Sequence, residues 1–234
     1  MPSRLDDLVR FYRILNRLEA RCGGRRTLAT CTGKTPWPPR GVYFFMEAGE
    51  GRTDSGEGLR IVRVGTHALK RGSRTTLWTR LSQHGGQQRS GGGNHRGSIF
   101  RLLVGTALNK ARERFCPTWG QGSTASGEIR TAEEALEQHV STIIRAMPFL
   151  WVPITDDPGP DSLRGYIERN AIALLSNYRK APLDPPSATW LGHSCDREKV
   201  RASGLWNQNH VEEDYAPAFL DTLELLVGDM RQAA

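Results

Sequence analysis

Two short apolar runs with a long polar insertion between them constrain the fold of this chain more than any other feature. Residues 41–46 (GVYFFM) and 59–65 (LRIVRVG) are rich in β-branched and aromatic side chains, which favour strands. The insertion, residues 47–58, carries glycines and charges and is long for a hairpin loop. The sequence therefore predicts two neighbouring strands with a wide connection between them.

The rest of the chain alternates between helical patterns and one further strand. Residues 149–154 (FLWVPI) are predicted to form a third strand, and Pro153 indicates that its end lies at an edge or outside the ladder. Apolar spacing and capping signals predict helices over 4–20, 76–84, 98–112, 131–146, 162–177 and 216–231. We therefore expect an α+β fold, in which a small three-stranded antiparallel sheet is flanked by helices, with helical extensions at both ends.

Length and composition limit the class of protein. A chain of 234 residues can bury a full core, and we expect an N-terminal helix and proline-rich connector (1–40), a central core (41–180) and a linker with a helical extension packed on it (181–234). No apolar run approaches the length of about 20 residues that spans a bilayer. The first residues lack a secretory pattern, so a cytoplasmic protein without membrane contact is expected.

Charge and cysteine usage add weaker constraints. The net charge of +7 and pI of about 9.6 favour binding of polyanions such as nucleic acids. None of the four cysteines forms a CxxC pair, so free thiols are expected. His193 and Cys195 lie two residues apart, but two ligands do not complete a tetrahedral zinc site.

Several chemically active side chains follow the two strands in a regular order. Tyr43 lies on the first strand, Gly65 ends the second, and Arg80 and His84 lie one helical turn apart on the next helix. Such a set can deprotonate a water and bind a phosphate. A carboxylate farther along the chain could add a metal ion.

Taken together, these residues resemble the GIY-YIG nuclease family. The matching segments are Gly41-Val42-Tyr43, Arg63-Val64-Gly65, Arg80, His84 and Glu168, within residues 41–177. The resemblance implies a metal-dependent DNA endonuclease in which Tyr43, Arg80 and His84 are catalytic and Glu168 binds the metal. With one credible carboxylate, a single Mg²⁺ or Mn²⁺ ion is expected rather than a two-metal pair.

The chain departs from the family pattern in its second motif, where Arg63 replaces a tyrosine. Arg63 could contact a phosphate or point to solvent. His95 lies where some members carry a further histidine. The asparagine that braces the site has two candidates, Asn177 and Asn207, of which Asn207 is favoured because it follows an aromatic residue as in the family.

The resemblance also suggests partners and biological roles. Double-stranded DNA is the expected substrate, and the basic segments 71–74, 89–101 and 110–114 are expected to follow its backbone. A homodimer would suit double-strand cutting. Restriction, antiphage defence and repair are the candidate roles, and the long 47–58 insertion favours the restriction-enzyme-like branch. The alternative is a catalytically impaired nucleic-acid-binding module of the same fold. A serine or cysteine hydrolase is disfavoured, because no GxSxG motif is present.

Overall fold

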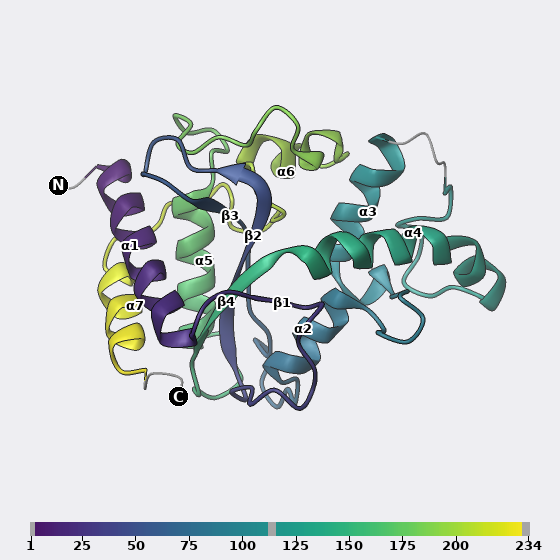
Figure 1. Ribbon diagram of the computed structural model, residues 1–234, viewed down its shortest axis with the longest axis horizontal. Coiled ribbons are helices and arrows are strands. Elements are labelled where there is room, and N and C mark those ends of the chain that lie inside the picture. Colours follow the sequence, from purple (N-terminus) through teal and green to yellow (C-terminus); the bar gives the residue numbers. More distant parts are fainter. Residues whose placement is uncertain (1–2, 112–115, 231–234) are drawn as a thin grey trace.

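The computed structural model describes residues 3–111 and 116–230, and in this part of the chain helices surround a central sheet (Figure 1). In chain order the elements are α1 (Arg4–Cys22), β1 (Arg26–Thr27), β2 (Gly41–Gly51), β3 (Leu59–Gly65), α2 (Leu77–Gly85), η1 (His95–Gly97), α3 (Ile99–Ala111), α4 (Gly127–Ala146), β4 (Pro148–Pro153), α5 (Leu163–Leu175), η2 (Leu191–Ser194), α6 (Glu198–Ser203) and α7 (Phe219–Gly228). No helix among these residues is long and apolar enough to cross a membrane.

The sheet has four strands in the order β1-β4-β2-β3, and every neighbouring pair is antiparallel. The prediction of three strands is therefore wrong, because the sheet contains a fourth. The additional strand, β1, contains two residues and pairs with β4 through Arg26 and Phe149. Its sequence is too short and too polar to show the alternation by which strands are recognised.

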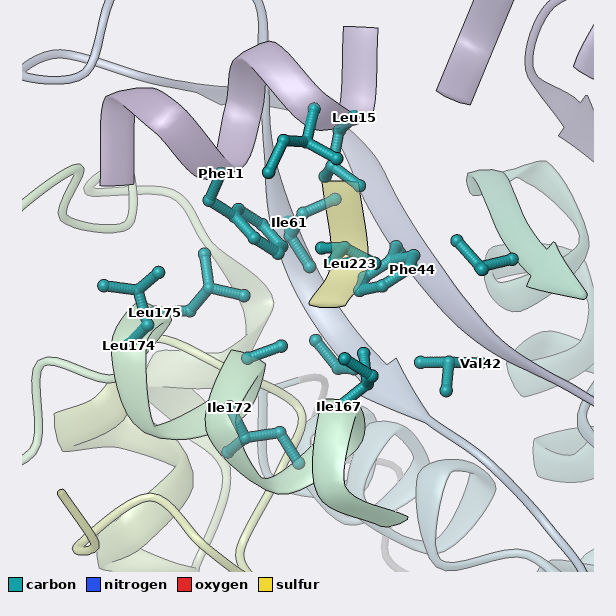
Figure 2. Close-up of a cluster of buried hydrophobic side chains, with 14 of the residues drawn as sticks. Phe11, Leu15, Val42, Phe44, Ile61, Ile167, Ile172, Leu174, Leu175 and Leu223 are labelled. Carbon is teal, nitrogen blue, oxygen red and sulfur yellow. The ribbon is translucent and has the colours of Figure 1, made fainter. Parts of the chain in front are cut away.

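Alternating side chains of the central strand β2 supply two apolar cores, one on each face of the sheet. Val42 and Phe44 point into the core that α1, α5 and α7 cover, shown in Figure 2. Tyr43 and Phe45 point into the opposite core, which α2, α3 and α4 cover. The run of residues 41–46 is buried on both sides for this reason, and it shows no polar alternation.

The N-terminal helix is well defined by its ends and by its packing. Ser3 and Asp6 form a reciprocal capping box at its start, and Gly23 ends it in the left-handed conformation. Phe11 and Leu15 lie in the same core as α5 and α7. Both terminal helices therefore complete the core over one face of the sheet.

Three other predicted boundaries differ from the structure. Strand β2 continues to Gly51, so part of the expected 47–58 loop is paired with β3. Helix α4 begins at Gly127, because Ser126 accepts a hydrogen bond from the Ile129 amide. The region before α7, expected to be irregular, contains η2 and α6. Residues 112 and 231, predicted as helix ends, lie outside the described residues.

Candidate active site

Tyr43 lies at the centre of the sheet, where strand register fixes its neighbours. It pairs with Gly65 on β3 and with Trp151 on β4. Close packing explains why both Gly41 and Gly65 are glycines. A Cβ on Gly41 would collide with the Val152 carbonyl, and a Cβ on Gly65 would overlap the phenol ring of Tyr43. The absence of a side chain at Gly65 therefore gives the ring its place across the strand.

The phenol of Tyr43 contacts the histidine predicted from the first helix. Its hydroxyl lies 2.7 Å from His84 Nε2, and His84 Nδ1 lies 2.7 Å from Ser98 Oγ. Burial lowers the pKa of His84 well below its usual range, and Arg80, Arg63 and Arg101 lower it further. The imidazole is therefore neutral near pH 7, with one ring nitrogen available as an acceptor.

Arg63 is buried in the site, so the expectation that it could point to solvent is wrong. It stands two residues before Gly65 on β3, and its guanidinium donates to the Trp206 carbonyl at 2.5 Å. It also lies 5.4 Å from the ring of Phe100. Burial lowers the pKa of Arg63, and the neighbouring charges of Tyr43 and Glu168 oppose that shift. A permanent positive charge thus replaces the second phenol of the motif.

A cleft of about 400 Å³ opens beside this group, and it gathers predicted residues from distant segments. Arg63 from β3, Arg80 from α2, Glu168 from α5 and Asn207 from the loop after α6 all line it. Arg80 is half-buried and donates to the Gly97 carbonyl at 3.1 Å. The cleft therefore brings two arginine side chains and one carboxylate together, and the arginines can stabilise negative charge on a phosphoryl group.

Tyr43 and His84 lie beneath this cleft. Both side chains are 0 % exposed, and neither lines the cleft. Arg63 is next to Tyr43 and does line the cleft. The phenol is consequently one layer of side chains away from the space in which a substrate would bind.

Glu168 is the carboxylate that lines the cleft. Its Oε1 atom accepts a hydrogen bond from the Thr66 amide at 3.0 Å, which orients the group, and Oε2 has no hydrogen-bond partner in residues 3–111 or 116–230. Burial raises the pKa of Glu168, and Arg63 is the charge that opposes the rise most strongly. A free, oriented carboxylate oxygen with a desolvation penalty fits a hard divalent ion.

The donor set also limits the number of ions. Within the described part of the chain, no cluster of three or more histidine, cysteine, aspartate or glutamate side chains could hold a metal. An ion at Glu168 would therefore keep most of its waters, as Mg²⁺ does in many enzymes.

The two candidate asparagines have different places. Asn207 is buried at the cleft, where Oδ1 accepts from the Val64 amide at 3.2 Å and Nδ2 donates to the Val64 carbonyl at 3.0 Å. It thereby holds the end of β3 that carries Gly65. Asn177 does not line the cleft and instead bonds both backbone groups of Leu183. The structure therefore brings Asn207, and not Asn177, to the site.

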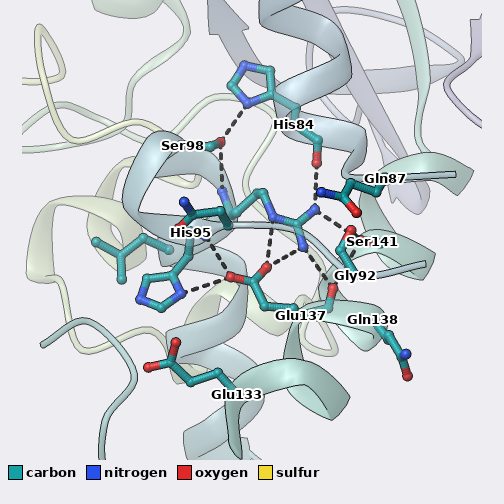
Figure 3. A network of polar contacts seen from close by, with 12 residues as sticks. His84, Gln87, Gly92, His95, Ser98, Glu133, Glu137, Gln138 and Ser141 are labelled. Carbon is teal, nitrogen blue, oxygen red and sulfur yellow. Dashed lines mark hydrogen bonds and ion pairs between the residues drawn. The ribbon is translucent and has the colours of Figure 1, made fainter. Parts of the chain in front are cut away.

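His95 also lies away from the cleft, in a buried polar network shown in Figure 3. Its Nδ1 contacts Glu137 Oε1 at 2.9 Å, and its ring stacks on Trp119 at 3.9 Å. The same glutamate accepts from Arg101, whose Nη1 also donates to the His84 carbonyl at 2.9 Å. His95 thus supports the scaffold behind His84, and it is not placed to contact a substrate.

This network changes the expected nucleic-acid surface. Within the basic segment 89–101, Arg96 forms an ion pair with Glu133 and Arg101 with Glu137. These two charges are neutralised inside the protein. Arg89, and Arg71 and Arg74 of the segment 71–74, remain exposed. Residues 112–114 of the third segment lie outside the described residues.

Sequence reasoning missed several residues around the cleft. Lys70, His67 and His210 line it, and Ser98 and Thr66 bond to His84 and Glu168. The signal for His210 was its place in the segment that carries Asn207. The others lie in loops or at element ends, and only the folded chain shows their partners.

The sheet carries a buried tyrosine–histidine pair, and a carboxylate lies beside an arginine-lined cleft, a combination that can bind a phosphodiester. The chain matches the family model of the GIY-YIG domain over residues 2–233, and it belongs to this family. GIY-YIG domains are generally endonucleases, so the protein is of nuclease type. No curated protein and no solved structure matches the chain.

Proposed function

We propose that this protein is a divalent-metal-dependent DNA endonuclease whose reaction takes place in the cleft between Arg80 and Glu168. The observation that carries the proposal is the convergence of these two residues with Arg63 and Asn207, from four separate segments, on one cleft. The family membership supports nuclease chemistry. The overall positive charge supports a polyanionic substrate.

In this mechanism Glu168 would hold a single Mg²⁺ or Mn²⁺ through its free Oε2 atom. When bound, the ion neutralises charge on the scissile phosphate and on the leaving 3′ oxygen. Arg80 and Arg63 stabilise the negative charge that develops on the phosphoryl oxygens. Asn207 keeps the end of β3, and hence Arg63, in place through its two bonds to Val64.

Tyr43 would accept the proton of the attacking water, directly or through a further water. The tautomer of His84 with its proton on Nδ1 donates to Ser98 and leaves Nε2 to accept the phenolic proton of Tyr43. Burial lowers the pKa of His84, so the ring is neutral near pH 7 and its Nε2 atom can accept this hydrogen bond. Because the phenol lies beneath the cleft, transfer through a further water fits this arrangement better than direct contact.

Nicking of supercoiled plasmid tests the proposal. The wild-type protein is expected to produce open-circular and linear DNA with Mg²⁺ or Mn²⁺, and none with EDTA. Sequencing of the ends produced on a mixed DNA substrate then reports polarity and specificity. Cleavage that continues unchanged in EDTA would contradict the metal-dependent reaction.

The burial of Tyr43 supports a second candidate function, a nucleic-acid-binding module of the same fold with impaired catalysis. In that case the cleft would bind phosphates while the phenol stays out of reach of water. A protein of this kind retards DNA in a gel but produces no nicks with any divalent ion. The same plasmid assay therefore separates the two functions.

For the biological role of the protein, we propose restriction or antiphage defence rather than repair. The long hairpin of β2 and β3 supports this proposal, because Asp184 fixes the turn by accepting hydrogen bonds from the amides of Thr53, Asp54 and Ser55. The turn lies at the opposite end of β3 from Gly65 and none of residues 47–58 lines the cleft, so contacts with bases there would be made outside the cleft. A homodimer would supply two clefts, one for each strand of the DNA. Light scattering tests whether the protein is a dimer in solution.

A further inference from the structure

His210 occupies a distinctive place on the wall of the cleft. It lies in the loop after α6, three residues beyond Asn207, and lines the same cleft as Glu168 and Arg80. Its backbone is left-handed, with φ of 64°, a conformation that is uncommon outside glycine and enriched in asparagine, aspartate and histidine. Its side chain is 32 % exposed, so an ion or ligand can approach it.

A carboxylate fixes the orientation of the His210 ring. Nδ1 lies 2.6 Å from Glu213 Oε1. An ionised carboxylate only accepts hydrogen bonds, so Nδ1 carries a proton in this contact. In the neutral ring Nε2 is then a lone-pair donor, and it has no hydrogen-bond partner in the described ranges. Metal-binding histidines are generally oriented in this way by a carboxylate behind the ring.

Glu168 from α5 and His210 from the loop after α6 line the same cleft. Glu168 offers a free Oε2 atom and His210 a free Nε2 atom. One oxygen donor and one nitrogen donor, each oriented by a hydrogen bond on its other atom, therefore belong to residues of the same cleft.

We propose that His210 Nε2 and Glu168 bind one divalent ion together, with waters completing its coordination. The inference rests on the proposed function and deepens it by adding a nitrogen ligand. Imidazole favours Mn²⁺ and the later transition metals over Mg²⁺ when compared with an all-oxygen site. The protein should therefore discriminate between these ions in the absence of any nucleic acid.

Titration of the free protein with Mn²⁺, followed by electron paramagnetic resonance, measures this binding directly. His210→Asn is the central variant, since asparagine tolerates the left-handed backbone. We expect it to weaken Mn²⁺ binding by about tenfold or more and to weaken Mg²⁺ competition less. Glu213→Ala leaves the His210 backbone unchanged and frees the ring, and about a tenfold loss is expected there too.

Two further variants make the outcomes distinguishable. Glu168→Gln should abolish Mn²⁺ binding, and His193→Asn, an exposed histidine that does not line the cleft, should leave it unchanged. Wild-type Mn²⁺ affinity in both His210→Asn and Glu213→Ala, with binding lost in Glu168→Gln, would overturn the role of His210 alone. Wild-type affinity in all three would also overturn the metal site of the proposed function.

Discussion

The hydroxyl of Tyr43 lies 2.7 Å from Nε2 of His84, and both side chains are completely buried. The two residues come from β2 and α2, 41 positions apart in the sequence, and Ser98 bonds to the other ring nitrogen. This chain of three side chains is the core of the candidate site. Its integrity depends on the glycine beneath the phenol and on the ion pair behind the histidine.

Replacing Tyr43 by Phe should remove acid–base chemistry while the fold is retained. Cleavage is expected to fall on the order of 10²- to 10⁴-fold. His84 Nε2 loses its hydrogen-bond partner, which costs about 1–3 kcal/mol of the free energy of unfolding. Single-turnover rates and thermal melting measure the two effects. Full cleavage by this variant would rule out Tyr43 as the base or its relay.

Gly65→Ala tests the close approach of the Tyr43 ring to β3. The new Cβ overlaps the phenol, so either the ring or the strand must shift. We expect a loss of about 1–3 kcal/mol in stability, typical of overpacking, and a lower cleavage rate. Gly127→Ala is the matched control, because nothing lies near its Cβ. Equal melting temperatures and rates for both variants would contradict this packing.

The buried pair of Arg101 and Glu137 should be among the most costly to break. Arg101→Met leaves a buried carboxylate with less compensation, and such losses cost about 3–5 kcal/mol. Urea unfolding measures this, and Arg89→Met on the exposed loop should change stability by no more than about 0.5 kcal/mol. Because Arg101 also bonds the His84 carbonyl, the nuclear magnetic resonance signals of the His84 ring should shift. An Arg101→Met protein as stable as Arg89→Met would refute the assignment.

His67 should make stability depend on pH. Burial, and next Arg164, lower its pKa to about 4. The usual pKa of histidine is about 6.5. Between pH 6.5 and pH 4 the unfolded chain therefore binds a proton at His67 that the folded chain does not bind. Stability attributable to neutral His67 is therefore fully present above pH 6.5 and declines as the pH falls toward 4.

The variant His67→Leu removes this titration. Relative to wild type, its free energy of unfolding should rise as the pH is lowered from 7.5 to 5, in urea unfolding at several pH values. His193→Asn should follow the wild-type curve, since that side chain is exposed. Parallel curves for wild type and His67→Leu would show that His67 keeps its usual pKa in the folded protein.

Long elements with strong patterns could be predicted from the sequence. The strand at residues 59–65 and the helix near residues 4–20 have the expected bounds to within two residues, because apolar spacing and caps determine them locally. Strand β1 and helix α6 could not be predicted. β1 exists because β4 offers an unpaired edge to Arg26 and Thr27, and a tertiary contact of this kind has no local signature.

The site shows the same division. Glu168 and Arg80 meet at the cleft as the family resemblance implied, whereas His95 matched in sequence position but lies in the scaffold with Glu137. The difference arises from the partner on α4, which is 42 residues away and which the sequence does not pair with His95. Motif order therefore indicates which residues are candidates, and packing decides which of them face the substrate.

Comparison of wild-type protein with Glu168→Gln tests the central claim most directly, by measuring plasmid nicking and DNA retention on the same samples with Mg²⁺ and Mn²⁺. The exchange keeps the shape of the side chain and its contact with the Thr66 amide but removes the charge that would hold the ion. The account predicts nicking by wild type alone and equal retention of DNA by both proteins. Equal nicking by Glu168→Gln, at the same melting temperature, would contradict it.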